Sequence, residues 1–373
     1  MEVVWHELRN FLFCTYLSTK GHIRSRNLKP EPMKDPVDFV VTWVDGADPK
    51  WKAEKEKYQR AIGIADRHRD NGEERYRDWE LFRYWFRAVE KYAPWVRNVY
   101  LITEGHIPEW LNLDCPKLKH ICHEDYIPKE YLPTFNSNVI ELNIHRIEGL
   151  SEHFISFNDD TFLAAPCIPE DFFSEGKPNY TAVMIPPENL DNSSFSHSRF
   201  SVFGQINKQF RFEIVDIMKE HPELWFHPSY GYHKMYNTAA IKLDSVQGMF
   251  FSHLPVAFRK SAFQKAWELF PEVLHDTSTH RFRTAQDVMH ELVSLMDILN
   301  NDFYPVSMSQ HGYACYNPKK EKNMIHEILH SKDRLTLCIN DSEEIDYEDY
   351  LSLKSFLINE FQQVFPEKSM YEK

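Results

Sequence analysis

Short apolar runs with a two-residue period recur along the chain and predict buried strands. The first run, 38–44, is rich in β-branched and aromatic residues and stops at the turn signal Asp45-Gly46, as expected of a central strand. Two further runs, 99–103 and 117–122, predict additional strands. We interpret these runs as the central strands of an α/β fold.

Apolar residues at helical spacing predict a second set of elements. They recur in this way in 1–16, 75–92 and 138–147, whereas 51–70 is charged and is typical of a solvated helix. The region 186–234 is aromatic, rich in histidine and irregular. It is predicted to be an inserted helical subdomain that could form a wall for an acceptor.

Composition narrows the class of protein. Hydrophobic residues make up 42% of the 373 residues, enough for a sizeable core, and no long Gly/Ser linker divides the chain. The net charge of −13 argues against a general nucleic-acid binder, which needs a clustered basic face. The six cysteines form no CxxC pair, which favours free thiols in a reducing compartment and a cytoplasmic protein.

The N-terminal segment 1–16 leaves two interpretations open. Charged residues interrupt its apolar positions, so it predicts neither a signal peptide nor a membrane span. An amphipathic helix could pack on the domain or lie on the inner face of a membrane. Basic residues follow it and would suit the second interpretation. They are Lys20, Arg24, Arg26 and Lys29.

The run 153–163 carries the candidate chemistry. Its hydrophobicity stops abruptly at Asn158, Asp159 and Asp160, as expected where a strand meets a cleft. Two adjacent carboxylates suit a hard cation such as Mg²⁺ or Mn²⁺, which substrate phosphates would complete. A polar turn between two strands is the alternative for a bare Asp-Asp pair.

Four blocks of sequence occur in an informative order. They are DFVVTWVDG at 38–46; RYRDWELFRYWFRAVEKYAPWVR from Arg75 through LPTFNSNVIELNIHRIEGL to FNDD at 157–160; HLP at 253–255, FPE at 270–272 and THRFRTAQD at 279–287; and LCINDSEE at 337–344 with FPEKSMYE at 365–372. In this order they resemble the Stealth family of sugar-1-phosphate transferases. Trp79 and its aromatic neighbours replace a more polar run of many members, which favours the bacterial branch.

The resemblance implies a fold and a reaction. The fold would be α/β, with a GT-A-like, Rossmann-type nucleotide-sugar transferase core. The reaction would transfer a hexose- or N-acetylhexosamine-1-phosphate from a UDP-sugar to a hydroxyl of an oligosaccharide or lipid-linked glycan, releasing UMP, in capsular or cell-surface polysaccharide synthesis. The expected parts are a helix and linker in 1–36, a nucleotide-sugar-binding part in 37–185, a helical insert in 186–250 and the rest of the catalytic core in 251–373.

The resemblance also suggests roles for particular residues. Asp159 and Asp160 would hold the metal, completed by Asn340 and Asp341 at a second strand end. His253 is the candidate base, and Arg283 would stabilise phosphoryl oxygens. Asp287 is expected to orient Arg283 or His280. The expected donor-binding residues are Asp38, Trp43, Val44, Asp45, Gly46, Arg77, Arg83 and Asn136.

Several alternatives remain open from the residues alone. Trp43 could simply pack in the core, and the arginines of 75–92 could form surface ion pairs. Asn136 or Ser137 could cap the helix 138–147. A metal-dependent GT-A glycosyltransferase that releases UDP is the alternative enzyme, and a catalytically silent carbohydrate-binding module is the third possibility.

Overall fold

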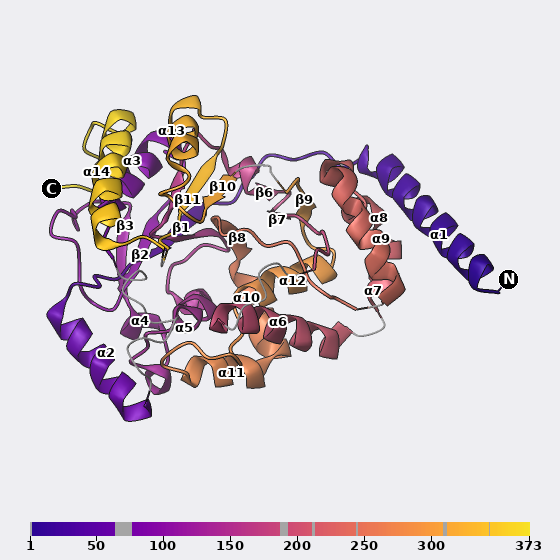
Figure 1. Ribbon diagram of the computed structural model, residues 1–373, viewed down its shortest axis with the longest axis horizontal. Coiled ribbons are helices and arrows are strands. Elements are labelled where there is room, and N and C mark those ends of the chain that lie inside the picture. Colours follow the sequence, from indigo (N-terminus) through magenta and orange to yellow (C-terminus); the bar gives the residue numbers. More distant parts are fainter. Residues whose placement is uncertain are drawn as a thin grey trace.

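A mixed α/β architecture is seen in the computed structural model of the chain (Figure 1). The structure describes 2–63, 77–186, 193–210, 213–243, 245–308, 312–342 and 344–373, with side chains from residue 11 onward. Arg75 and the end of the predicted helix 51–70 lie outside the described residues.

The main sheet has five strands in the order β3-β2-β1-β4-β8. Neighbours are parallel from β3 to β4, and only β8 runs antiparallel. The predicted strands are confirmed: 99–103 and the strand that stops at Asn158 are observed as predicted, whereas 38–44 and 117–122 are shifted by one or two residues at their ends. Strand β8 was not predicted. The strands are β1 Val37–Thr42, β2 Val99–Thr103, β3 Leu118–Cys122, β4 His153–Asn158 and β8 Val256–Arg259.

Strand β1 is central because both of its faces are apolar. Phe39 and Val41 point into one core, and Val40 points into the core on the opposite face. All three are fully buried. This explains why 38–44 is almost continuously hydrophobic, as parallel strands covered by helices on both faces usually are.

A second sheet, β10-β11-β5, pairs strands from the C-terminal part of the chain with β5, the strand that follows the two aspartates. β5 runs directly after Asp160 and pairs antiparallel with β11. The Ile339 amide donates to the Asp160 carbonyl at 2.9 Å. The remaining strands are β5 Thr161–Leu163, β10 Gly312–Cys315 and β11 Thr336–Ile339, and a small third sheet holds β6 Phe173–Ser174, β7 Lys177–Tyr180 and β9 Tyr304–Pro305.

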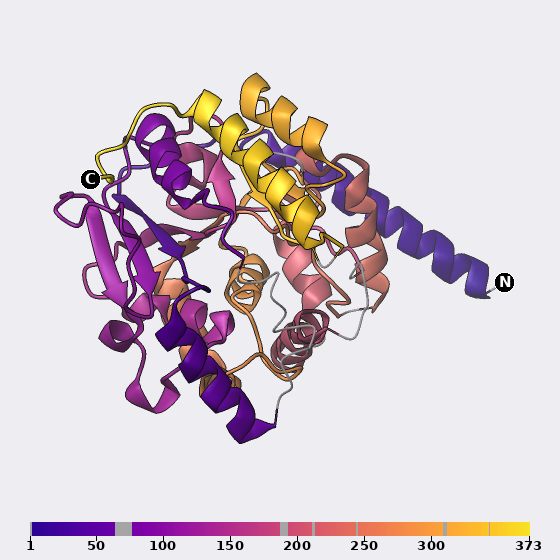
Figure 2. The same cartoon turned by 60° about the vertical axis from the view of Figure 1, so that its left-hand side comes forward.

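Helices cover both faces of the main sheet (Figures 1 and 2). One side carries α3 Phe82–Tyr92, α13 Lys322–Ser331 and α14 Tyr347–Val364. The other side carries α5 Ser137–Leu142, α6 Ser194–Phe210, α10 Lys260–Leu269, α11 Pro271–Thr279 and α12 Glu291–Leu299. At the edges lie α2 Pro49–Ile62, α4 His123–Tyr126, α7 Ile214–Glu220, α8 Pro222–Trp225 and α9 Lys234–Leu243.

Two predicted helices are shorter than their apolar patterns. Helix α3 begins at Phe82 because the chain before it is irregular, with Glu80 at a φ of +58°. Helix α5 ends at Leu142 and is followed by the 3₁₀ turn Ile144–Arg146. The region 186–234 is largely helical where it is described, as predicted, and its helices continue to Leu243 in α9.

Helix α1, Glu2–Ser25, is longer than predicted and packs against α8. Cys14, Leu17 and Gly21 form a buried stripe along it. A side chain at Gly21 would place its Cβ 2.3 Å from the Pro222 carbonyl oxygen, so glycine is required for this close approach. None of the described helices combines the length and hydropathy that crossing a bilayer requires.

Candidate active site

A cleft of about 970 Å³ lies at the carboxyl ends of β1 and β4. From β1 the chain crosses to β2 and β3 on one side, whereas β4 lies on the other side. The junction between β1 and β4 is therefore a topological switch point, the usual ligand-binding position in open α/β sheets. Thr42 and Asn158 end the two strands in register, and both line the cleft.

The aspartates after β4 lie in this cleft. Asp160 Oδ1 is buried and has no hydrogen-bond donor within reach. Asp159 is exposed to the lumen of the cleft, yet the surrounding walls desolvate it and the charge of Asp160 repels it. Together these effects raise the pKa of Asp159 to about 8. Two carboxylates in such a place are stabilised by a cation.

His253 is held between two asparagines from different sheets. Its Nε2 lies 3.0 Å from the Asn158 amide, and its Nδ1 lies 3.0 Å from the Asn340 amide. Neutral imidazole has one N–H, so one of these amides must present its oxygen and the other its N–H. The two asparagines therefore hold the imidazole ring in place, and its Nε2 lies 3.9 Å from Asp160 Oδ1.

Tight packing supports the position of His253. A Cβ at Gly312, on β10, would lie 2.5 Å from the Leu254 side chain and 2.3 Å from Thr336 Oγ1. Only glycine fits there. Leu254, the residue after His253, therefore packs against the second sheet, close to β11, the strand that ends just before Asn340.

Arg77 closes the cleft on the C-terminal side. Its guanidinium donates to Asp341 Oδ1 at 2.7 Å and to the Ile345 carbonyl at 2.9 Å. It also lies over the Tyr350 ring. Arg77 and Asp341 line the cleft, but each already has a protein partner.

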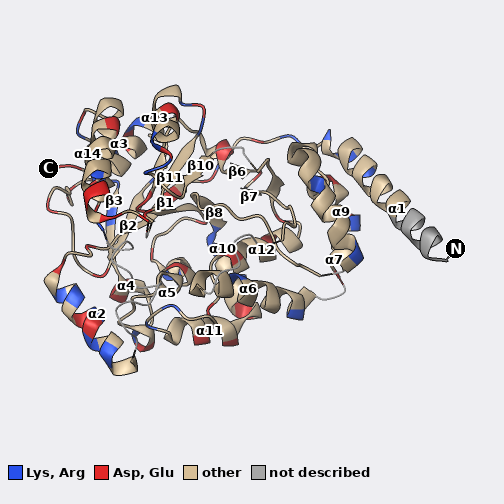
Figure 3. Cartoon of the chain, in the orientation of Figure 1, with Lys and Arg blue, Asp and Glu red and all other residues tan. Residues whose placement is uncertain are grey.

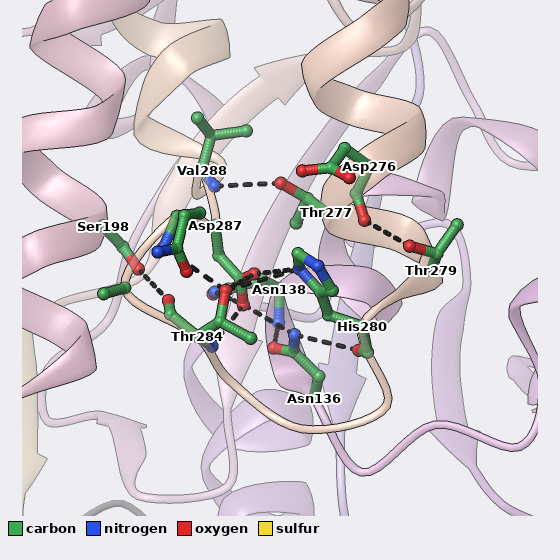
Figure 4. Close-up of polar contacts among 12 residues, drawn as sticks. Asn136, Asn138, Ser198, Asp276, Thr277, Thr279, His280, Thr284, Asp287 and Val288 are labelled. Carbon is green, nitrogen blue, oxygen red and sulfur yellow. Dashed lines mark hydrogen bonds and ion pairs between the residues drawn. The ribbon is translucent and has the colours of Figure 1, made fainter. Parts of the chain in front are cut away.

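A network around Asp287 builds the opposite wall (Figure 4). Asp287 accepts hydrogen bonds from Asn136 Nδ2 at 2.8 Å and from Thr284 Oγ1 at 2.7 Å. It also pairs with His280 Nδ1 at 2.7 Å, and this hydrogen bond raises the pKa of His280. The network ties the loop that carries Arg283 to the start of α5. Asp287 therefore orients His280, one of the two predicted alternatives.

Arg283 itself reaches into the cleft. Its Nη2 donates to Ser137 Oγ at 2.6 Å, and both residues line the cleft. Trp43 lines the cleft as well while it stacks on Phe82 at a centroid distance of 5.6 Å. Trp43 therefore packs on a core side chain and also lines the cleft, and its contact with the donor stays a prediction.

A buried ion pair in the cleft was not predicted as such. His290 Nδ1 lies 2.5 Å from Glu141 Oε2, and both residues line the cleft. Burial opposes a charged His290, but Glu291 and Glu141 outweigh it and raise the pKa of His290 to about 9. Glu141 had a visible signal, its helical position before the aspartate strand, whereas nothing in the local sequence distinguishes His290 from the other histidines.

Five predicted donor-binding residues do not line the cleft. Asp38 is a correction: it lies near the amino end of β1, fully buried, and binds Arg97 and the Ser151 amide. Asn136 is also buried and caps α5, so it supports the Asp287 network. Arg83 lies over the Trp110 ring. Asp45 and Gly46 form the turn after β1, where the Asp45 amide donates to His106 at 2.8 Å.

The donor set fits a divalent cation. Asp160 Oδ1 is a buried oxygen without a hydrogen-bond partner, and the adjacent Asp159 lines the same cleft. Adjacent carboxylates favour a hard ion such as Mg²⁺ or Mn²⁺. Asn340 and Asp341 lie beside this position with His253 and Arg77 as partners, so their role as metal ligands stays a prediction.

Comparison with known proteins identifies the family. Residues 35–63, 75–180 and 252–292 match conserved regions 1, 2 and 3 of Stealth proteins. The chain is 40% identical over 344 residues to the capsular polysaccharide phosphotransferase WcwK of Streptococcus pneumoniae, which covers 91% of this chain and all of that protein. The chain belongs to the Stealth family.

Other Stealth relatives are similar over the same length. The exopolysaccharide phosphotransferase cps2G of Lactiplantibacillus plantarum is 36% identical, over 90% of this chain and 96% of its own length. The receptor polysaccharide phosphotransferase WefC of Streptococcus oralis is 36% identical, over 90% and 99%. All three relatives are bacterial, as the run around Trp79 suggested. The fourth block, at 337–344 and 365–372, lies outside the three matched Stealth regions.

Proposed function

We propose that the protein transfers a hexose- or N-acetylhexosamine-1-phosphate from a UDP-sugar to a hydroxyl of a glycan acceptor and releases UMP, in the synthesis of a bacterial capsular or cell-surface polysaccharide. The observation that carries the proposal is the cleft at the switch point, where Asp160 and a doubly held His253 lie together. The names of the relatives, all polysaccharide phosphotransferases, support it. The core would be of the GT-A type, which the parallel order β3-β2-β1-β4 suits.

The donor would lie across the ends of β1 and β4. Trp43 and Val44 would contact the nucleotide, because both line the cleft next to the strand end. Mg²⁺ or Mn²⁺ held by Asp159 and Asp160 would neutralise charge on the diphosphate. Arg283, on the opposite wall, offers a planar set of N–H donors for the equatorial phosphoryl oxygens.

The reaction needs a base as well as charge neutralisation. The acceptor oxygen would attack the β-phosphorus, the bond from that phosphorus to the bridging oxygen would break, and UMP would leave. A neutral imidazole has one unprotonated nitrogen, and His253 would take the hydroxyl proton there once the acceptor hydroxyl replaces the asparagine amide at that nitrogen. The sugar keeps its anomeric configuration and its phosphate, since no bond to the anomeric carbon changes.

The nucleotide product tests this proposal. We expect the purified protein, given UDP-sugars, Mg²⁺ and acceptor glycans, to release UMP in step with a product that contains a phosphodiester. Chromatography of the nucleotides and ³¹P NMR of the product measure the two. UDP released without UMP, with a phosphate-free linkage, would overturn the proposal in favour of a glycosyltransferase. The same assay without metal ion is the control.

We also propose that α1 contacts the inner face of the membrane, where a lipid-linked acceptor would be found. Outside its buried stripe, α1 exposes Phe11, Leu12 and Tyr16, each more than half accessible. Figure 3 shows Lys and Arg on α1 and on the nearby α7 and α9. An apolar face with basic neighbours is typical of helices that lie on anionic bilayers.

Replacement of the exposed apolar face is expected to release the protein from vesicles. We predict that Phe11→Ser with Leu12→Ser weakens co-sedimentation with phosphatidylglycerol-containing vesicles at least about 10-fold, because each buried side chain contributes about 1.5 to 3 kcal/mol. Leu113→Ser with Ile168→Ser removes equally exposed side chains elsewhere and serves as the control. Equal binding by both double variants, or none by the unaltered protein, would contradict the proposal.

A further inference from the structure

A cluster of two histidines and a glutamate lies outside the cleft, between α13 and α14. His326 Nδ1 lies 2.7 Å from Glu360 Oε2, and His330 Nε2 lies 3.0 Å from the same oxygen. The two imidazole centroids are 4.5 Å apart. Both helices are described in full, and they pack side by side (Figure 2).

The helix geometry makes this arrangement rigid. His326 and His330 are four residues apart, so they share one face of α13. Ile325, Ile328 and Leu329 are buried against the core and fix the rotation of that helix. The two rings therefore project from a fixed helix toward one point on α14.

Glu360 is a buried carboxylate whose partners are the two imidazoles. It is only 5% exposed, and among the described residues no lysine or arginine pairs with it. Burying a carboxylate is costly unless a cation or several donors compensate it. The two imidazoles converge on its Oε2, and a neutral imidazole can equally present a lone pair to a metal ion.

We propose that His326, His330 and Glu360 form a binding site for a divalent transition-metal ion of the zinc class. Ligands about 2.0 to 2.1 Å from a tetrahedral ion lie about 3.3 Å apart, so the contacts of 2.7 and 3.0 Å need to open by only a few tenths of an ångström. Two imidazoles and one carboxylate suit Zn²⁺, Ni²⁺ or Cu²⁺, whereas Mg²⁺ and Ca²⁺ prefer oxygen ligands only.

The ion would clamp the two helices that flank β11. Helix α13 precedes this strand and α14 follows it, and Asn340 and Asp341 come directly after the strand. Linking the two helices would hold Asn340 and Asp341, which follow β11 and contact His253 and Arg77. His326 is more than half exposed, so the site has an entry path for the ion and open coordination positions.

Zinc titration of the full-length protein tests the site. The cleft offers a second group of ligands, so the experiment uses Asp160→Asn as the background for every variant. Isothermal titration with Zn²⁺, and the visible absorption of bound Co²⁺, are measured with and without His326→Gln/His330→Gln. We expect the double variant to lose one equivalent of metal and the Co²⁺ bands that report nitrogen ligands.

The matched control is His221→Gln. His221 also pairs with a glutamate, at 2.9 Å from Glu223, but among the described residues no second imidazole completes a metal-binding group there. The variant His221→Gln should leave the Zn²⁺ titration unchanged. The single variant His326→Gln, at an exposed position, should weaken Zn²⁺ binding at least about 10-fold, since loss of a residue that merely orients a ligand already costs about 10- to 100-fold. Unchanged stoichiometry and affinity in the histidine variants would overturn the proposal, as would an equal loss in His221→Gln.

Discussion

Asp160→Asn is expected to lower turnover at least about 10³-fold while the protein stays folded. The substitution keeps the shape of the side chain but removes the charge of a carboxylate whose buried Oδ1 has no hydrogen-bond partner. If that charge holds a cation on the diphosphate, its loss removes several kcal/mol of transition-state stabilisation, and about 4 kcal/mol corresponds to 10³ in rate.

Two measurements separate a metal ligand from a structural residue. Donor binding at increasing Mg²⁺ should saturate for the unaltered protein and stay weak for Asp160→Asn. The unfolding temperature measured without metal should not fall in the variant, because the substitution relieves the repulsion between Asp160 and Asp159. Asp114→Asn, at an exposed position outside the cleft, is the control. Near-normal turnover of Asp160→Asn would show that Asp160 holds no essential ion.

Local pattern predicted β1 to β4 well because each is a short apolar run with a clear stop. The boundary at Asn158 marked both the end of β4 and the cleft, since a buried strand cannot continue through three polar residues. Asp38 shows where this reasoning fails. It belongs to the same motif as Trp43, but along a strand that rises about 3.3 Å per residue it lies about 16 Å from that residue, at the opposite end of the sheet.

The contacts that assemble the site were not predictable in the same way. Asn340 reaches His253 because β5 and β11 pair across a long sequence separation, and no local pattern encodes that register. The pair of His290 with Glu141 joins the residue before α12 to α5 across 149 positions of the sequence. Arg77 resembled a phosphate ligand in sequence, yet the fold brings Asp341 to 2.7 Å from it. Tertiary pairing, rather than residue type, decided these partners.

His253→Ala is expected to lower the turnover rate by about 10² to 10⁴, with little change in donor affinity. This range corresponds to about 3 to 5 kcal/mol, as expected when a positioned base is lost. The fold should tolerate the change, because the His253 side chain is about one-third exposed and its two asparagine partners can reach solvent in the cleft.

The design distinguishes a base from a binding residue. His221→Ala removes an exposed histidine far from the cleft lining and should leave both constants unchanged. Asn340→Ala leaves the imidazole of His253 in place but removes the amide that contacts its Nδ1. This variant should therefore reduce turnover less than His253→Ala does. If His253→Ala instead raised the donor Kd strongly at unchanged turnover, His253 would bind the diphosphate and another group would have to accept the hydroxyl proton. Glu141, which lines the same cleft and pairs with His290, would then be the first carboxylate to substitute.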